Sequence, residues 1–217
     1  MSFRIPVRPA EADTIVRGSR FRAWIGRAVD AEEAAAALHR RVAAGKDATH
    51  HCWAYRIWRD ERVEEAGFDA GEPSGTAGRP ILGSLQAAAL IQTVCVVSRW
   101  FGGVKLGTGG LVRAYAESTR SAIEGARETG AVLDARQEVT IDVRFPYALL
   151  GAVRGVVSRF AAASAGSDYS EVVDLELRVP ADRADAFERA LADGTAGGID
   201  LRRGTPRWEA VPPNAAR

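Results

Sequence analysis

Hydrophobic and polar residues follow the periods of strands and helices along most of the chain. Alternating patterns predict strands at 20–25, 49–58, 138–145 and 172–179. Apolar residues that recur every three to four positions predict helices at 30–46, 80–92, 111–126, 147–160 and 182–192. A nearly unbroken apolar run at 93–100 is typical of a strand buried on both faces. The mixture predicts an α+β protein.

The ends of two helices carry local signals. Asp30 and Glu33 have the spacing of a capping box, and Gly45 is a natural C-terminal stop. Pro80 fits the first position of the next helix. The segment between them, EEAGFDAGEPSGTAG at 64–78, predicts a loop by its Gly, Pro, Ser and Asp content, and ordered loops of that length are often functional.

The pattern resets around 129–137, which places a domain boundary near Asp134. We expect one domain at 1–134, a second at 135–210 and a frayed tail at 211–217. A short strand at 166–169 and a last strand starting at Ile199 complete the order β-α-β-β-α-β in the second domain. That order is the ferredoxin-like signature.

Composition narrows the classes of partner and compartment. The net charge of +1 excludes binding through global basicity, so a charged partner requires a local patch. Cys52 and Cys95 lack metal-ligand spacing and fit buried thiols in a reducing compartment. With no signal peptide and no apolar run long enough to span a bilayer, we expect a cytoplasmic protein.

The stretch RWFGGVKLGTGGLVRAY, residues 99–115, combines five glycines with three cations and two adjacent aromatic residues. Glycines before a helix N-terminus, with cations and stacking rings beside them, are typical of anion and nucleic-acid contacts. We therefore expect a binding surface made by Arg99, Trp100, Lys105, Gly107, Gly109, Gly110 and Arg113. One of Trp100 and Phe101 is expected to be exposed. The glycines match neither the Walker A nor the dinucleotide fingerprint, and a simple tight crossover is the alternative.

A second set of residues could line a pocket: His50, Glu72, Ser74 and Thr76. No nucleophile elbow or triad order supports hydrolysis. His50 and His51 are adjacent on a strand and point to opposite faces, so they cannot both bind one metal, and no metal or cofactor is predicted. A hydrogen bond from His50 to the loop at Glu72 is the structural interpretation.

Three segments, at 48–56, 71–82 and 99–115, together resemble the bacterial two-domain branch of the YigZ/IMPACT family. The resemblance implies an N-terminal domain with the fold of the second domain of a small-subunit ribosomal protein. It also implies a C-terminal ferredoxin-like domain like the last one of elongation factor G. Two departures are Ala70, where the family usually has Asp, and Trp100, where it often has Tyr.

These observations lead to a translation-associated binding module that contacts RNA or the ribosome through the glycine-rich stretch. The alternative is an enzyme that binds a small molecule or a nucleotide phosphate in a pocket formed by His50, the GEPSGTAG loop with Glu72, Ser74 and Thr76, and the glycine-rich stretch. A protein-binding adaptor is a third possibility. An enzymatic role is the less favoured, and a monomer is favoured over an oligomer.

Overall fold

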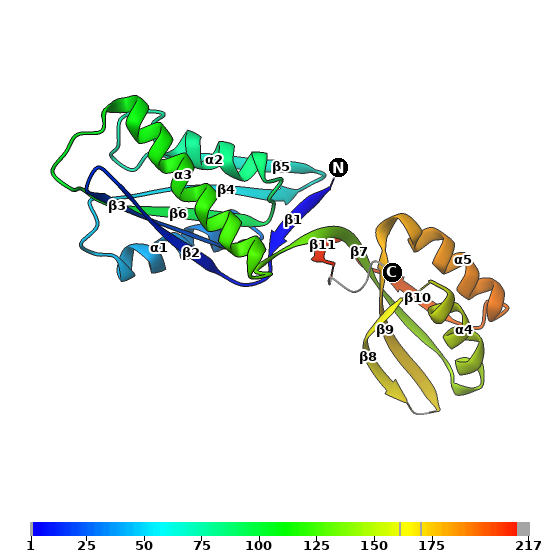
Figure 1. Ribbon diagram of the computed structural model, residues 1–217. Helices are drawn as coiled ribbons and strands as arrows, with labels where there is room; N and C mark the ends of the chain where they lie inside the picture. The colour runs from blue at the N-terminus through cyan, green and yellow to red at the C-terminus, as the bar shows by residue number, and fades with distance from the viewer. Residues whose placement is uncertain (1, 161, 170, 212–217) are drawn as a thin grey trace. The chain divides into compact units, whose positions relative to one another are not determined.

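The computed structural model describes residues 2–160, 162–169 and 171–211. The chain divides into two compact units (Figure 1). The N-terminal unit comprises Met1–Ala135 with the segment from Ala210, and the C-terminal unit comprises Arg136–Glu209. Both contain helices and strands, which confirms the α+β class. Apart from Val211, the expected tail lies outside the described residues.

An antiparallel five-stranded sheet forms the centre of the N-terminal unit. Its strands, in spatial order, are β2 (Ala10–Val16), β3 (Ser19–Arg27), β6 (Thr93–Trp100), β4 (His50–Arg59) and β5 (Arg62–Phe68). The middle strand β6 is buried from Thr93 to Arg99, as its apolar run predicts. It therefore carries side chains into a core on each face.

Helices cover the two faces unequally (Figure 1). On one face, α2 (Gly78–Ala87) and α3 (Gly107–Glu128) bury the larger core, which includes Phe21 and Tyr115. On the other, α1 (Ala31–Ala44) buries a small cluster through Ala34 and Ala37. The predicted capping box is confirmed: the Asp30 carboxylate accepts from Glu33 N at 2.8 Å, and Glu33 accepts from Val29 N at 3.0 Å.

The segment at 64–78 differs from the predicted loop. Its first part lies in β5, and α2 begins at Gly78, two residues before Pro80. Gly67 and Gly78 are needed because the helix start touches the strand: a Cβ on Gly78 would lie 2.3 Å from Phe68 N. Strands β1 (Phe3–Pro6) and β2 were not predicted. β1 has only 4 residues, and β2 contains two acidic residues and lies at an edge of the sheet.

In the C-terminal unit, helices and strands follow one another as β-α-β-β-α-β: β7 (Val132–Pro146), α4 (Leu150–Phe160), β8 (Ala163–Tyr169), β9 (Val172–Pro180), α5 (Ala184–Gly194) and β10 (Asp200–Arg203). The strands pair in the order β10-β7-β9-β8. Single turns of 3-10 helix, Tyr147–Leu149 and Ala181–Arg183, precede the two helices. The predicted last strand is two short ones, β10 and β11 (Arg207–Ala210).

The core of this unit lies between its helices and its sheet, with Phe145 and Phe187 among its largest buried side chains. The first residues of β7 belong to the N-terminal unit, where they pair with β1. No helix in the described part of the chain combines the length and apolarity needed to cross a membrane.

Two backbones cross closely at the end of the five-stranded sheet. A Cβ on Gly102 would lie 2.0 Å from the carbonyl carbon and oxygen of Gly18, in the turn between β2 and β3. No side chain rearrangement relieves a contact with backbone. We expect Gly102→Ala to lower the free energy of unfolding by about 2 kcal/mol, measured by urea denaturation.

Gly125→Ala is the matched control for this substitution. Gly125 lies within α3, and a Cβ there would meet nothing within 4 Å. The change should stabilise the protein by about 0.5–1 kcal/mol, because alanine loses less backbone entropy in a helix. Equal effects of the two substitutions would contradict the close crossing.

Candidate nucleic-acid interface

Segments that are far apart in sequence meet at one end of the five-stranded sheet (Figure 1). The pairings of Arg99 with His50 and of Trp100 with Arg20 place the end of β6 beside the starts of β4 and β3. The crossing at Gly102 adds the turn between β2 and β3. Contacts of Glu72 bring in the loop at 69–77 and α3. Both parts of the predicted site therefore lie at this end.

Arg99 and Glu72 form a buried ion pair beneath the end of the sheet. Arg99 Nη1 lies 2.6 Å from Glu72 Oε1, and the two side chains are only 6% and 3% exposed. The Tyr115 hydroxyl of α3 donates to the same oxygen at 2.8 Å. This corrects the expectation that Arg99 lies on the exposed binding surface. Arg99 shares its strand face with Cys95 and Val97, so it enters the core that α2 and α3 cover.

Cys52 and Tyr115 extend this network without adding reactive groups. The Cys52 Sγ lies 2.9 Å from the Asp69 carbonyl oxygen and 3.3 Å from the Tyr115 hydroxyl oxygen, and its one hydrogen can be donated to either. Burial raises the pKa of Cys52 to about 12, and it raises the pKa of Tyr115 well above its ordinary range. Both groups stay protonated at neutral pH, so neither supplies a nucleophile or a base there.

Asp69, which the sequence did not single out, organises the loop and the start of α2. Its carboxylate accepts hydrogen bonds from the backbone N–H groups of Gly75, Ala77 and Gly78 at 2.7, 2.9 and 2.9 Å. Partial burial by itself would raise the pKa of Asp69, but the three donors lower it on balance. The negative charge therefore sits at the positive end of α2. An Asp before a Gly-rich helix start was the available signal.

His50, Ser74 and Thr76 play separate parts in the same region. His50 Nδ1 lies 3.1 Å from the Ala70 carbonyl, so His50 binds the predicted loop, but at Ala70 and not at Glu72. Thr76 donates to the Pro73 carbonyl at 2.6 Å within a turn, and Ser74 is exposed. His51 points to the opposite face, as predicted, and lies 2.8 Å from Ser98 Oγ. In the described residues no group of three His, Cys, Asp or Glu side chains is placed to hold a metal.

The exposed part of the site is the turn between β6 and α3 and the helix start. Helix α3 begins at Gly107, so Gly107, Gly109 and Gly110 form its first turn and are not part of a loop before Leu111. Its N-cap, Leu106, makes no side-chain cap hydrogen bond, and the first turn contains no acidic residue. Backbone N–H groups at this positive helix end therefore lack the carboxylate that α2 has.

Two of the three predicted cations, Lys105 and Arg113, are exposed at this helix start. The Arg113 guanidinium reaches back over the first turn, with Nη1 3.6 Å from where a Cβ on Gly109 would be. Phe101 is 47% exposed, whereas Trp100 is partly buried. The guanidinium carbon of Arg20 lies over the Trp100 ring, 5.0 Å from the ring centroid. The prediction that one of the two aromatic residues is exposed is confirmed for Phe101.

Comparisons with known proteins find similarity over most of the chain. Residues 17–123 match the Impact N-terminal domain, and residues 143–197 match a domain of unknown function, DUF1949. The chain is 33% identical over 194 residues to the IMPACT family member YvyE of Bacillus subtilis (strain 168), covering 89% of this chain and 87% of that protein. It is 31% identical over 201 residues to the IMPACT family member YigZ of Escherichia coli (strain K12), covering 92% and 97%.

A solved structure is similar over nearly the same extent. It is the crystal structure of a hypothetical protein, with a TM-score of 0.63 and 29% sequence identity, and the match covers 92% of this chain and 96% of that one.

Breaking the buried ion pair should cost far more than breaking a surface pair. Glu72→Ala leaves the Arg99 guanidinium buried without a counter-charge, and we expect a loss of about 3–5 kcal/mol in the free energy of unfolding. The control is Glu64→Ala, which removes the partly exposed partner of exposed Arg62 at 3.8 Å and should cost less than about 1 kcal/mol. Urea denaturation measures both, and similar losses would contradict the role of the pair.

The Asp69 carboxylate should make part of the stability depend on pH. Because the folded state lowers the pKa of Asp69, its contribution is present above the ordinary pKa and is lost as pH falls through the folded one. Asp69→Asn should therefore cost about 1 kcal/mol at pH 7, and the difference from the wild type should shrink by about pH 3. Thermal denaturation at the two pH values measures it. A difference that grows on acidification would exclude this role.

Proposed function

The chain belongs to the YigZ/IMPACT family, and on that premise we propose that it is a translation-associated binding module that contacts RNA or the ribosome. The contact is made through the loop surface, which we define as Phe101, Lys105, Arg113 and the first turn of α3. Arg99 supports this surface from below and is not part of it.

One observation carries the proposal: two exposed cations lie at a helix start that has neither a side-chain cap nor an acidic residue. The first N–H groups of a helix and its dipole favour an anion, and Lys and Arg neutralise phosphates. The other helix that starts at this end of the sheet, α2, already has the Asp69 carboxylate. A phosphate of the partner would take the corresponding place at α3.

The fold supports the same partner class. We propose that the C-terminal unit is ferredoxin-like, because its helices and strands follow the β-α-β-β-α-β order and its strands pair as β10-β7-β9-β8. We also propose the ribosomal-protein-like fold for the N-terminal unit, which the resemblance implies. Both folds occur in components of the translation apparatus, which favours a partner from that apparatus.

Charge distribution favours the N-terminal unit as the RNA-binding part. In the C-terminal unit the exposed side of β9 carries Asp174, Glu176 and Arg178, and Glu176 pairs directly with Asp142 of β7. Acidic side chains on a sheet face repel phosphates. Arg144 lies 3.9 Å from Asp174 on the same face, so carboxylates and cations are mixed there. The loop surface in the N-terminal unit carries Lys105 and Arg113 without a carboxylate in the first turn of α3.

The alternative of a nucleotide-binding enzyme has less support. Glu72 is held by Arg99 and Tyr115, the Thr76 hydroxyl donates to Pro73 and His50 binds the Ala70 carbonyl, so three of its four expected pocket residues are engaged internally. A reducing, cytosolic location is part of our proposal, and the two buried free thiols support it. A monomer fits the proposal as well.

Removing the two exposed cations should weaken RNA binding in a salt-dependent way. We expect ribosomal RNA retained on filters by the wild type to show a negative slope of log K against log salt. Lys105→Ala/Arg113→Ala should reduce that slope by about 1.4, since each phosphate contact contributes about 0.7 for a single strand. Both side chains are exposed, so the fold should survive.

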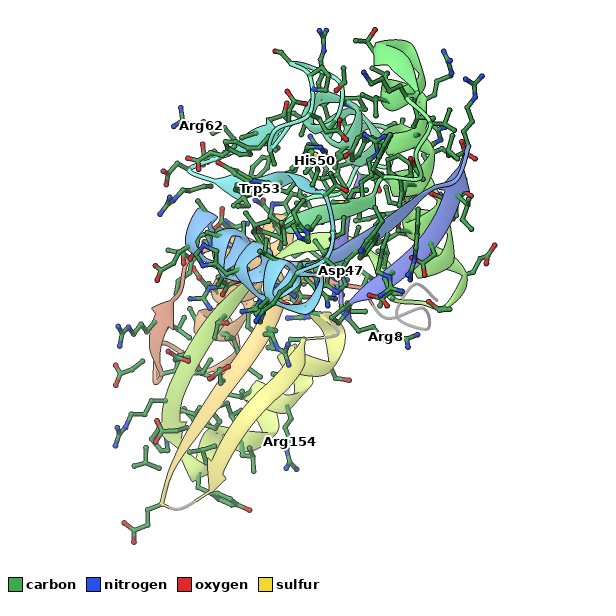
Figure 2. All side chains as sticks on the ribbon, turned by 90° about the vertical axis from the view of Figure 1, so that its left-hand side faces the viewer. Arg8, Asp47, His50, Trp53, Arg62 and Arg154 are labelled. Carbon is green, nitrogen blue, oxygen red and sulfur yellow. The ribbon has the colours of Figure 1, made fainter. Side chains whose placement is uncertain are left out.

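The control variant removes the same charge elsewhere. Arg62→Ala/Arg154→Ala deletes two exposed arginines, labelled in Figure 2, that are not part of the loop surface: Arg62 in β5 and Arg154 in α4 of the C-terminal unit. It should leave the slope unchanged. Equal, salt-insensitive retention by the wild type and both variants would refute RNA binding.

A further inference from the structure

Phe101 is an exposed aromatic residue whose backbone position is fixed by the fold. It directly follows the last residue of β6 and is 47% exposed. Its backbone N–H donates to Thr49 Oγ1 at 3.1 Å, and the next N–H, of Gly102, donates to Ser19 Oγ at 3.2 Å. With the backbone crossing at Gly102, these bonds fix the point from which the ring projects.

The ring also has a fixed support beneath it. The Arg99 guanidinium carbon lies 5.5 Å from the ring centroid of buried Phe21 and 5.6 Å from that of Phe101. Arg99 itself cannot turn away, because its Nη1 is paired with Glu72 in the core. A cation near an aromatic ring attracts it, so this contact orients Phe101 while leaving much of the ring exposed.

The surroundings of the exposed ring have the chemistry of a nucleic-acid surface. Lys105 and Arg113 are exposed in the same turn and helix start, and the first turn of α3 lacks acidic residues. Cations that track a phosphate backbone, next to a ring on which a base stacks, are the features by which proteins bind single strands. In a duplex the base faces are already stacked, so a protruding ring gains little there.

We propose that Phe101 is a base-stacking residue and that the loop surface therefore selects single-stranded RNA over duplex RNA. This inference rests on the proposed function and specifies the RNA that the surface takes. Lys105 and Arg113 supply the salt-dependent part of the affinity, and Phe101 supplies the preference for an unpaired base.

The test compares a 12-nucleotide single-stranded RNA that carries 2-aminopurine with a duplex of the same sequence. Fluorescence anisotropy gives the affinities, and quenching of 2-aminopurine reports stacking. The wild type should bind the single strand at least about tenfold more tightly than the duplex. Phe101→Ala should lose about tenfold on the single strand together with the quenching, at an unchanged salt slope.

Two further variants distinguish an effect of the aromatic ring from an effect of any exposed apolar side chain. Phe101→Trp keeps an aromatic face and should retain the affinity and the quenching. Val104→Ala removes an apolar side chain that is 49% exposed in the same turn, and it should leave both unchanged. A melting temperature close to that of the wild type shows that each variant is folded.

The outcomes distinguish this inference from the function on which it rests. If the wild type binds RNA with a salt slope but Phe101→Ala binds and quenches equally well, stacking is refuted and the proposed function stands. A preference for the duplex has the same meaning. If the wild type binds neither RNA, both the inference and the proposed function fail.

Discussion

A guanidinium and a carboxylate lie together in the interior of the N-terminal unit, and removal of either leaves an unpaired charge in the core. Arg99 comes from the central strand β6 and Glu72 from the loop before α2, while the Tyr115 hydroxyl of α3 binds the same carboxylate oxygen. Three segments are thereby fixed to one point. An unpaired charge in the core is costly, so the loop before α2 and helix α3 stay where Glu72 and Tyr115 can reach their partners.

The pair also sorts the charges of the glycine-rich stretch. One cation faces inward and makes the scaffold rigid, whereas Lys105 and Arg113 remain at the surface. The two helix starts at this end of the sheet divide in a similar way. The Asp69 carboxylate accepts hydrogen bonds at the start of α2. The start of α3 consists of glycines and a threonine, and exposed cations lie near it. A rigid, locally positive surface results on a chain of nearly zero net charge.

Strong local patterns predicted the helices, the caps of α1 and the buried strand β6, since these depend on side chains close in sequence. Strand β5 was missed because its Gly67 suggested a loop, whereas this glycine admits the backbone of Gly78. The inward direction of Arg99 follows from the strand period that it shares with Val97, but its charge suggested the surface. Its partner Glu72, 27 residues away, is set by tertiary structure.

The two buried thiols are natural probes of how the N-terminal unit opens. Alkylating reagents attack the thiolate, and burial raises the pKa of both Cys52 and Cys95 to about 12, so labelling requires opening of the structure. Both side chains are fully buried, but Cys52 is hydrogen-bonded to the Asp69 carbonyl of the loop, whereas Cys95 lies in the central strand β6. Their separate labelling rates therefore compare opening at the loop with opening at the centre of the sheet within one molecule.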